Sequence, residues 1–184
     1  MKTEKPTTKI IAGKYKGKVL ELPSLDVTRS SKSMLKESLF NVLQFDIIDK
    51  IFIESFAGSG SIGLEAISRG AKRAYFIELD RNSYQILLKN CKSIDMEKCQ
   101  TVQGNTFVQT PLFIDFLKNS QDEIVLYVDP PFDYRDGMED IYEKSFAMIR
   151  DIDVDNIYMI IVEHVSSLEI PQVLGRFSLK KKKK

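Results

Sequence analysis

Four residues at the end of an apolar stretch have the types that can hold and orient a polar substrate. The stretch Ile124–Val128 predicts a short strand buried on both faces, and Asp129-Pro130-Pro131-Phe132 follows it directly. Prolines lack the N–H group that a central strand needs, so the strand must end there. The resulting stiff tip presents a carboxylate, a free backbone carbonyl and an aromatic ring in fixed relation.

Such a tip suits chemistry at the exocyclic amine of a nucleic-acid base. That amine is a poor nucleophile because its lone pair is delocalised into the ring. Asp129 and the carbonyl of Pro130 can accept its two N–H bonds, and Phe132 can stack on a base that has left its helix. The rate gain would come mainly from positioning two reactants. The plainer alternative is that Asp129 only caps the following turn.

A second set of residues predicts a nucleoside cofactor. Gly58-Ser59-Gly60-Ser61-Ile62-Gly63 follows the predicted strand Ile51–Phe56 and opens a helix, which is the context in which this glycine pattern binds phosphates or nucleosides. Glu78 ends the next strand, 18 residues after Gly60 (78 − 60), where a carboxylate can accept hydrogen bonds from both ribose hydroxyls. These features fit NAD and S-adenosylmethionine equally well, but the tip at Asp129 favours S-adenosylmethionine. A chance glycine turn with a solvated glutamate is the alternative.

The elements that must position these residues alternate along the chain. A basic hairpin, with Lys14 and Lys16 in its turn, and a helix that follows a loop over 23–33 come first. Strands and helices then alternate from Lys50, which predicts an α/β fold: a mostly parallel sheet with helices on both faces. The expected strands are 9–12, 18–22, 51–56, 74–79, 100–103, 124–128 and 157–162, with a last one beginning at 177–179, and the expected helices run to about 44 and over 61–69, 81–92, 110–118 and 138–150.

Composition narrows the class of protein. The 184 residues are 43% hydrophobic and 29% charged, without a membrane-length apolar run or a secretory signal, so a cytoplasmic protein is expected. Two cysteines and a single histidine, His164, predict neither a metal site nor a Cys/His catalytic pair. The net charge is +1, but residues 1–40 hold nine Lys/Arg against four Asp/Glu and residues 115–155 hold four against twelve. The basic N-terminal segment, residues 1–40, could therefore bind a polyanion.

Together these motifs resemble a known family. FAGSG, the strand end at Glu78 and DPPF look like class I S-adenosylmethionine-dependent amino-methyltransferases. Residues 9–165 resemble more closely the RsmD family of small-subunit ribosomal RNA guanine-N2 methyltransferases. That resemblance rests on IIAGKYKGKVLELP at the hairpin, TRSSKSMLKESLFNVL, FAGSGSIGLEAISRGA and VDPPF.

The resemblance implies a Rossmann-like class I methyltransferase that acts on 16S ribosomal RNA of the small subunit and is a monomer. It implies a role for each matching position: Glu54, Phe56, Gly58 and Gly60 at the methionine part of the cofactor, Glu78 at the ribose, Asn105 near the adenine, Asp129, Pro130 and Phe132 at the guanine, and Lys14, Lys16 and Arg29 facing RNA. The chain departs from the family at Ser30, Ser33 and Met34, where the family commonly has a proline and then Asp-Arg. The family also ends in an antiparallel strand pair, so the C-terminal strand is expected to be incomplete.

Two units are expected: residues 1–45 as a basic hairpin and helix packed on the core, and residues 46–184 as the cofactor-binding core. The same motifs are also compatible with three other functions. These are a DNA adenine-N6 methylase, a cofactor-binding RNA module without catalysis and, more distantly, an NAD oxidoreductase. Glu163 fits a pocket position and a solvated one equally well, and His164 is expected at a strand end rather than in catalysis.

Overall fold

The computed structural model describes residues 6–23, 29–131 and 140–180, with the backbone alone for residues 29–33. Its helices are α1 (Arg29–Leu43), α2 (Ser61–Ser68), α3 (Arg81–Ile94), α4 (Thr106–Leu117) and α5 (Ile141–Arg150), with short 3-10 helices η1 (Gln44–Ile47) and η2 (Met96–Lys98). Its strands are β1 (Thr7–Lys9), β2 (Val19–Glu21), β3 (Ile51–Glu54), β4 (Arg73–Glu78), β5 (Cys99–Gln103), β6 (Ile124–Val128), β7 (Ile157–Val162), β8 (Val173–Leu174) and β9 (Phe177–Ser178).

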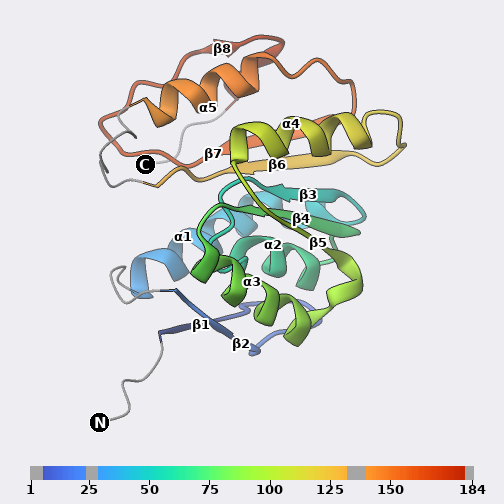
Figure 1. Ribbon diagram of the computed structural model, residues 1–184, viewed down its shortest axis with the longest axis vertical. Coiled ribbons are helices and arrows are strands. Elements are labelled where there is room, and N and C mark those ends of the chain that lie inside the picture. The colour runs from blue at the N-terminus through green and yellow to red at the C-terminus, as the bar shows by residue number, and fades with distance from the viewer. Residues whose placement is uncertain (1–5, 24–28, 132–139, 181–184) are drawn as a thin grey trace.

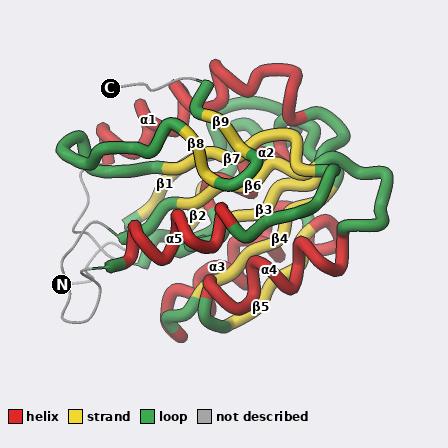
Figure 2. Tube along the Cα trace, turned by 90° about the horizontal axis from the view of Figure 1, so that it is seen from above, coloured by secondary structure: helices red, strands yellow, loops and turns green. Residues whose placement is uncertain are grey.

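Five parallel strands form the central sheet in the order β5-β4-β3-β6-β7 (Figure 2). Chain order reverses between β3 and β6, because β3 is followed by β4 on one side while β6 pairs on its other side. Ligands of open α/β sheets bind at such a switch point, beyond the carboxyl ends of the strands. The predicted α/β fold class is confirmed, and the switch point lies between the glycine-containing turn and the Asp129 tip.

Helices cover both faces of this sheet, with α1, α2 and α3 on one side and α4 and α5 on the other (Figure 1). Each face has its own apolar core. The first core joins hairpin residues such as Leu20 with Phe40 of α1 and Phe52 of β3. The second packs α4, α5 and the β8–β9 hairpin against residues such as Ile53 and Leu126. The central strands β3, β4 and β6 are buried on both sides, which explains their nearly continuous apolar sequences.

Three helix starts differ from the sequence expectation, the smallest difference being α5, which begins at Ile141 after its N-cap Asp140 rather than at 138. α1 begins at Arg29, inside the segment expected to be a loop. The hydrophilic residues 29–33 carry no apolar periodicity, so the sequence pattern could not reveal that they are helical. α4 begins at Thr106 rather than at Thr110-Pro111, so Pro111 lies inside the helix instead of at its first position. Asn105 caps the helix by accepting a hydrogen bond from the N–H of Phe107 at 2.9 Å.

The smaller differences are at strand ends. β1 is Thr7–Lys9 rather than 9–12, because the chain turns away after a backbone bond from the N–H of Ile10 to Lys18 O. Phe177–Ser178 pairs antiparallel with β8 in a two-stranded hairpin and does not join the main sheet. Among the described helices, none is both long and apolar enough to cross a bilayer.

Candidate active site

The turn after β3 contains two glycines in the left-handed region, Gly58 (φ +52°) and Gly60 (φ +75°). A Cβ on Gly60 would lie 2.4 Å from Cδ1 of Leu87, so this buried side chain of α3 would have to shift to admit it, and the positive φ of Gly60 also disfavours a side chain there. A Cβ on Gly58 would meet no atom within 4 Å. The turn is therefore packed closely against α3 at Gly60 and is bordered by open space at Gly58, which lets a ligand approach the backbone.

Glu54, the last residue of β3, is a carboxyl group almost removed from water, with 2% of the residue exposed. Its Oε2 accepts a hydrogen bond from the N–H of Gly63 in the first turn of α2, at 2.8 Å. The pKa of Glu54 is raised from its ordinary value of 4.5 to about 8, mainly by burial and in smaller part by the charges of Asp129 and Glu163, while the hydrogen bond from Gly63 lowers it in part. A buried carboxyl group beside two more carboxylates is a favourable place for a cation.

Because Glu54 keeps its proton in the folded protein, the free energy of unfolding should depend on pH in a specific way. The folded protein holds the proton of Glu54 up to about pH 8, whereas the unfolded chain releases it near 4.5. The stabilisation is therefore complete below pH 4.5 and is lost as the pH rises to about 8, by up to about 1.4 kcal/mol per pH unit. Glu54→Gln keeps an acceptor for the Gly63 N–H, so we expect a much flatter curve of unfolding free energy against pH. Glu97→Gln, at an exposed position, should keep the wild-type slope, and equal slopes in all three proteins would contradict the assignment.

Glu78 lies at the end of β4, and its carboxylate bridges two backbone segments. One oxygen accepts from the N–H of Gly58 at 2.6 Å and the other from the N–H of Asp80 at 2.7 Å. Burial raises its pKa, and these two hydrogen bonds lower it in part. The carboxylate is thus oriented by the backbone on both sides, next to the open position at Gly58.

Helix α4 is fixed to the end of β3 through hydroxyl groups. Thr106 donates to the carbonyl of Ser55, and the hydroxyls of Thr110 and Ser55 are 2.9 Å apart. These two threonines are four residues apart and lie on the same helix face. This tertiary anchoring explains why the helix continues through Pro111 despite its poor helix propensity. It also brings Phe107 against Phe56, edge to face, with ring centroids 5.9 Å apart.

The tip of β6 stands next to the glycine-containing turn because β3 and β6 are neighbours, with Glu54 paired to Tyr127. Asp129 is half-buried and Pro130 is buried. Phe132, expected to stack on a base, lies outside the described residues. Tyr127 is itself buried, and its hydroxyl donates to Oε1 of Glu163, the first residue after β7.

One large cavity of about 2170 Å³ unites these features. Pockets for a single small ligand are usually about 300–1,000 Å³, so the cavity has room for a cofactor and part of a second substrate. The predicted residues that line it are Glu54, Phe56, Gly58, Glu78, Asn105, Asp129 and Pro130. Gly60, within the turn, is buried and does not line the cavity. Lys14 and Lys16 are exposed on the hairpin. For Arg29 only the helical backbone is described.

The further lining residues, which were not predicted for the site or were left open, include Lys36, Phe107 and Glu163. Phe107 follows a helix cap, and Glu163 follows a strand directly, so position at an element end was the available signal. Nothing in the sequence marks Lys36, because its role depends on distant partners. Nδ1 of His164 donates to the carbonyl oxygen of the next residue, Val165, at 2.8 Å.

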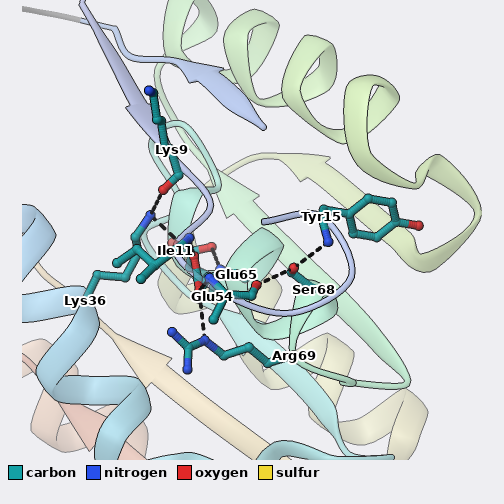
Figure 3. A network of polar contacts seen from close by, with 10 residues as sticks. Lys9, Ile11, Tyr15, Lys36, Glu54, Glu65, Ser68 and Arg69 are labelled. Atoms are coloured by element: carbon teal, nitrogen blue, oxygen red, sulfur yellow. Dashed lines mark hydrogen bonds and ion pairs between the residues drawn. The ribbon is translucent and has the colours of Figure 1, made fainter. Parts of the chain in front are cut away.

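Lys36 belongs to a buried network that attaches the hairpin to the core (Figure 3). Its Nζ donates to the carbonyl of Lys9 at 2.7 Å and lies 3.6 Å from Oε2 of Glu65 on α2. The Glu65 carboxylate also accepts from the N–H groups of Ile11 (2.7 Å) and Ala12 (3.0 Å) and from Nε of Arg69 (2.7 Å). One carboxylate therefore joins the hairpin, α1 and the helix that follows the glycine-containing turn.

Gly13 and Gly17 allow a matched test of this attachment. Both have nearly the same φ, +84° and +85°, but a Cβ on Gly13 would lie 1.9 Å from Ser68 O whereas one on Gly17 would meet nothing within 4 Å. Gly17→Ala should cost only the left-handed strain, about 1–2 kcal/mol. Gly13→Ala should cost about 1–3 kcal/mol more, because the backbones must separate. Urea unfolding measures both, and equal costs would show that the close approach at Gly13 is not maintained.

The sheet order, the glycine-containing turn and the acidic residues at successive strand ends define a class I methyltransferase fold. Residues 8–184 match the family model described as conserved hypothetical protein 95. A protein of Escherichia coli strain K12 named "Ribosomal RNA small subunit methyltransferase D" is 32% identical over 177 residues, which cover 95% of this chain and 83% of that protein. Its Haemophilus influenzae namesake is 38% identical over 133 residues, covering 71% of this chain and 66%, just under two thirds, of the relative.

Solved structures agree with these matches. The structure titled "Putative methyltransferase yhhF from Escherichia coli" is 30% identical, with a TM-score of 0.60 over 84% of this chain and 75% of the other. The chain therefore belongs to the RsmD family, and the predicted enzyme class, a methyltransferase that uses S-adenosylmethionine, is confirmed.

Proposed function

We propose that this protein is a cytoplasmic enzyme that methylates N2 of a specific guanine in 16S ribosomal RNA. The names of the Escherichia coli and Haemophilus influenzae relatives support a small-subunit RNA substrate. The observation that carries the proposed chemistry is the adjacency of β3 and β6, which brings Asp129 and Pro130 to the same cavity as the glycine-containing turn. An amine held at one tip and a methyl donor held at the other can meet there.

The residues on the β3 and β4 side fit S-adenosylmethionine, which supplies an electrophilic methyl group on a sulfonium. Glu54, buried beside the charges of Asp129 and Glu163, would release its proton when the positively charged methionine part binds next to it and Phe56. The open position at Gly58 allows close contact with the backbone, while Gly60 packs against Leu87 of α3. Glu78, oriented by the N–H groups of Gly58 and Asp80, would accept hydrogen bonds from the ribose hydroxyls.

The adenine end of the cofactor would lie near Asn105 and the aromatic side chains beside it. Because the Asn105 side chain already caps α4, it fixes where that helix begins and thereby places Phe107. We therefore assign Asn105 a positioning role near the adenine, with the Phe107 ring as part of the apolar wall.

On the β6 side, Asp129 and the Pro130 carbonyl would accept the two N–H bonds of the guanine amine. This arrangement turns the nitrogen lone pair toward the methyl group, and the proton released after transfer can pass to Asp129 or to water. Phe132 would stack on the base.

The basic hairpin and α1, residues 1–45, would bind RNA while residues 46–184 form the catalytic core. Lys14 and Lys16 are exposed on the hairpin, and with Arg29 they would contact phosphates. The Glu65 network fixes this unit to α2, so the RNA-binding surface and the cofactor turn keep a constant relation. The proposed working form is a monomer that acts on the small ribosomal subunit.

The test is methyl transfer from labelled S-adenosylmethionine to small subunits prepared from cells that lack the protein. Digestion and mass spectrometry of the RNA should reveal N2-methylguanine at one position. Methylation of DNA adenine instead, or no methylation of either nucleic acid, would contradict the proposal.

A further inference from the structure

Glu163 occupies the position next to Asp129 at the edge of the cavity. β6 and β7 are parallel, with Val128 paired to Val162, and the N–H of Glu163 continues the ladder by donating to Val128 O at 2.9 Å. Neighbouring strands lie about 4.8 Å apart, so Glu163 is the adjacent residue one strand away from Asp129. Both side chains line the same cavity.

The pairing also predicts the face of the sheet on which these carboxylates lie. Side chains alternate along a strand, so Asp129 follows Tyr127 on the side covered by α1 and α2. Tyr127 packs in the core of that side, and its partner on β3 is Glu54. The charges of Asp129 and Glu163 both raise the pKa values of Glu54 and Tyr127, which agrees with three carboxyl groups around one space.

The Tyr127 hydroxyl gives Glu163 a fixed orientation. Tyr127 is 1% exposed, and its O–H donates to Oε1 of Glu163. A tyrosine O–H bonded in this way keeps that oxygen toward the core. The Glu163 carboxylate is consequently a hydrogen-bond acceptor with a fixed orientation at the cavity wall and not a freely rotating surface group.

We infer that Glu163 accepts the N1–H of the target guanine and so selects guanine over bases that lack this hydrogen. The inference rests on the proposed function, in which Asp129 and Pro130 hold the neighbouring 2-amino group. Guanine presents N1–H and the 2-amino group side by side on its Watson–Crick edge, matching two acceptors on adjacent strand tips. Adenine has an unprotonated N1, whose lone pair would face the Glu163 carboxylate unfavourably.

The test compares guanine with 2-aminopurine, which keeps the 2-amino group but has no N1–H. Subunits are reconstituted with 16S RNA carrying either base at the position mapped for the wild-type enzyme, and kcat/KM for methyl transfer is measured. The wild type should prefer guanine at least about tenfold, the usual effect of a lost hydrogen bond to a charged group. In Glu163→Gln, Tyr127 should hold the amide oxygen, so that the NH₂ group faces the base and donates to N1 of 2-aminopurine. The preference should then fall at least about tenfold or reverse.

A second variant separates a change in base preference from a general loss of activity. Adding Tyr127→Phe to Glu163→Gln removes the group that fixes the amide, which can then turn its oxygen toward guanine and restore part of the guanine preference. An unchanged base preference in Glu163→Gln, with equal losses on both substrates, would overturn the inference. So would a weaker Kd for S-adenosylmethionine with unchanged preference, which would place Glu163 at the cofactor. A wild-type enzyme inactive on guanine subunits would contradict the proposed function itself.

Discussion

Replacing Asp129 by alanine is expected to reduce kcat by about 10²–10⁴-fold, the range associated with losing a positioned group that orients a reactant and takes its proton. The Kd for S-adenosylmethionine should change little, because the cofactor contacts proposed above come from β3, β4 and α4. Asp129→Asn retains one acceptor oxygen and should fall between the alanine variant and the wild type. Single-turnover methylation of subunits measures the rate, and calorimetry measures the Kd.

Asp115→Ala is the matched control for this experiment. Asp115 also lines the cavity but comes from the last turn of α4, where it pairs with Lys118 at 2.7 Å. Its removal changes the local charge equally and should leave kcat near the wild-type value. If Asp129→Ala instead weakened cofactor binding and left the single-turnover rate intact, the residue would belong to the cofactor site rather than to the amine.

A loss of stability is expected from Glu65→Ala, by about 3–5 kcal/mol, because the substitution leaves the buried Lys36 ammonium without its opposite charge. Lys36 is only 2% exposed, and burial already lowers its pKa while Glu65 raises it. The N–H groups of Ile11 and Ala12 would lose their acceptor at the same time. Urea unfolding followed by circular dichroism gives the change in free energy.

Two comparisons isolate the buried pair. Lys36→Met should cost less than Glu65→Ala, because Glu65 keeps Arg69 and its two backbone donors. The double variant should therefore be more stable than the sum of the single effects predicts, with a coupling of about 0.5–3 kcal/mol. Asp155→Ala removes an exposed ion pair with Arg176 and should change stability by about 1 kcal/mol or less. A Glu65→Ala effect no larger than that of Asp155→Ala would show that the network does not hold the hairpin.

The features that sequence alone predicted correctly are those encoded by local pattern. The alternation of apolar strands and amphipathic helices predicted the parallel sheet. The glycine-containing turn after Ile51–Glu54 and the prolines after Val128 marked two strand ends, and the switch-point rule makes such ends neighbours. The structure adds that Glu78 orients its carboxylate through Gly58, a bond that links two segments 20 residues apart.

The features that sequence reasoning missed depend on contacts between distant segments. Pro111 suggested a helix start, but the hydroxyl contacts of α4 with Ser55 outweigh that local preference. Lys36 and Glu65 look like ordinary surface charges in an amphipathic pattern, and only the fold makes them a buried pair. Glu163 acquires its orientation from Tyr127, 36 residues earlier in the chain. In each case a contact between residues distant in the sequence decides the structure, and periodicity or propensity along the chain cannot predict such a contact.

The central claim is that the Asp129 tip and the glycine-containing turn border one reaction space, and a crystal structure with S-adenosylhomocysteine bound tests it most directly. The account predicts the ribose at Glu78, the amino acid part beside Glu54 and Gly58, and the sulfur facing Asp129 with room for a base between them. A ligand bound elsewhere, or a sulfur directed away from Asp129 with protein filling the intervening space, would contradict the account.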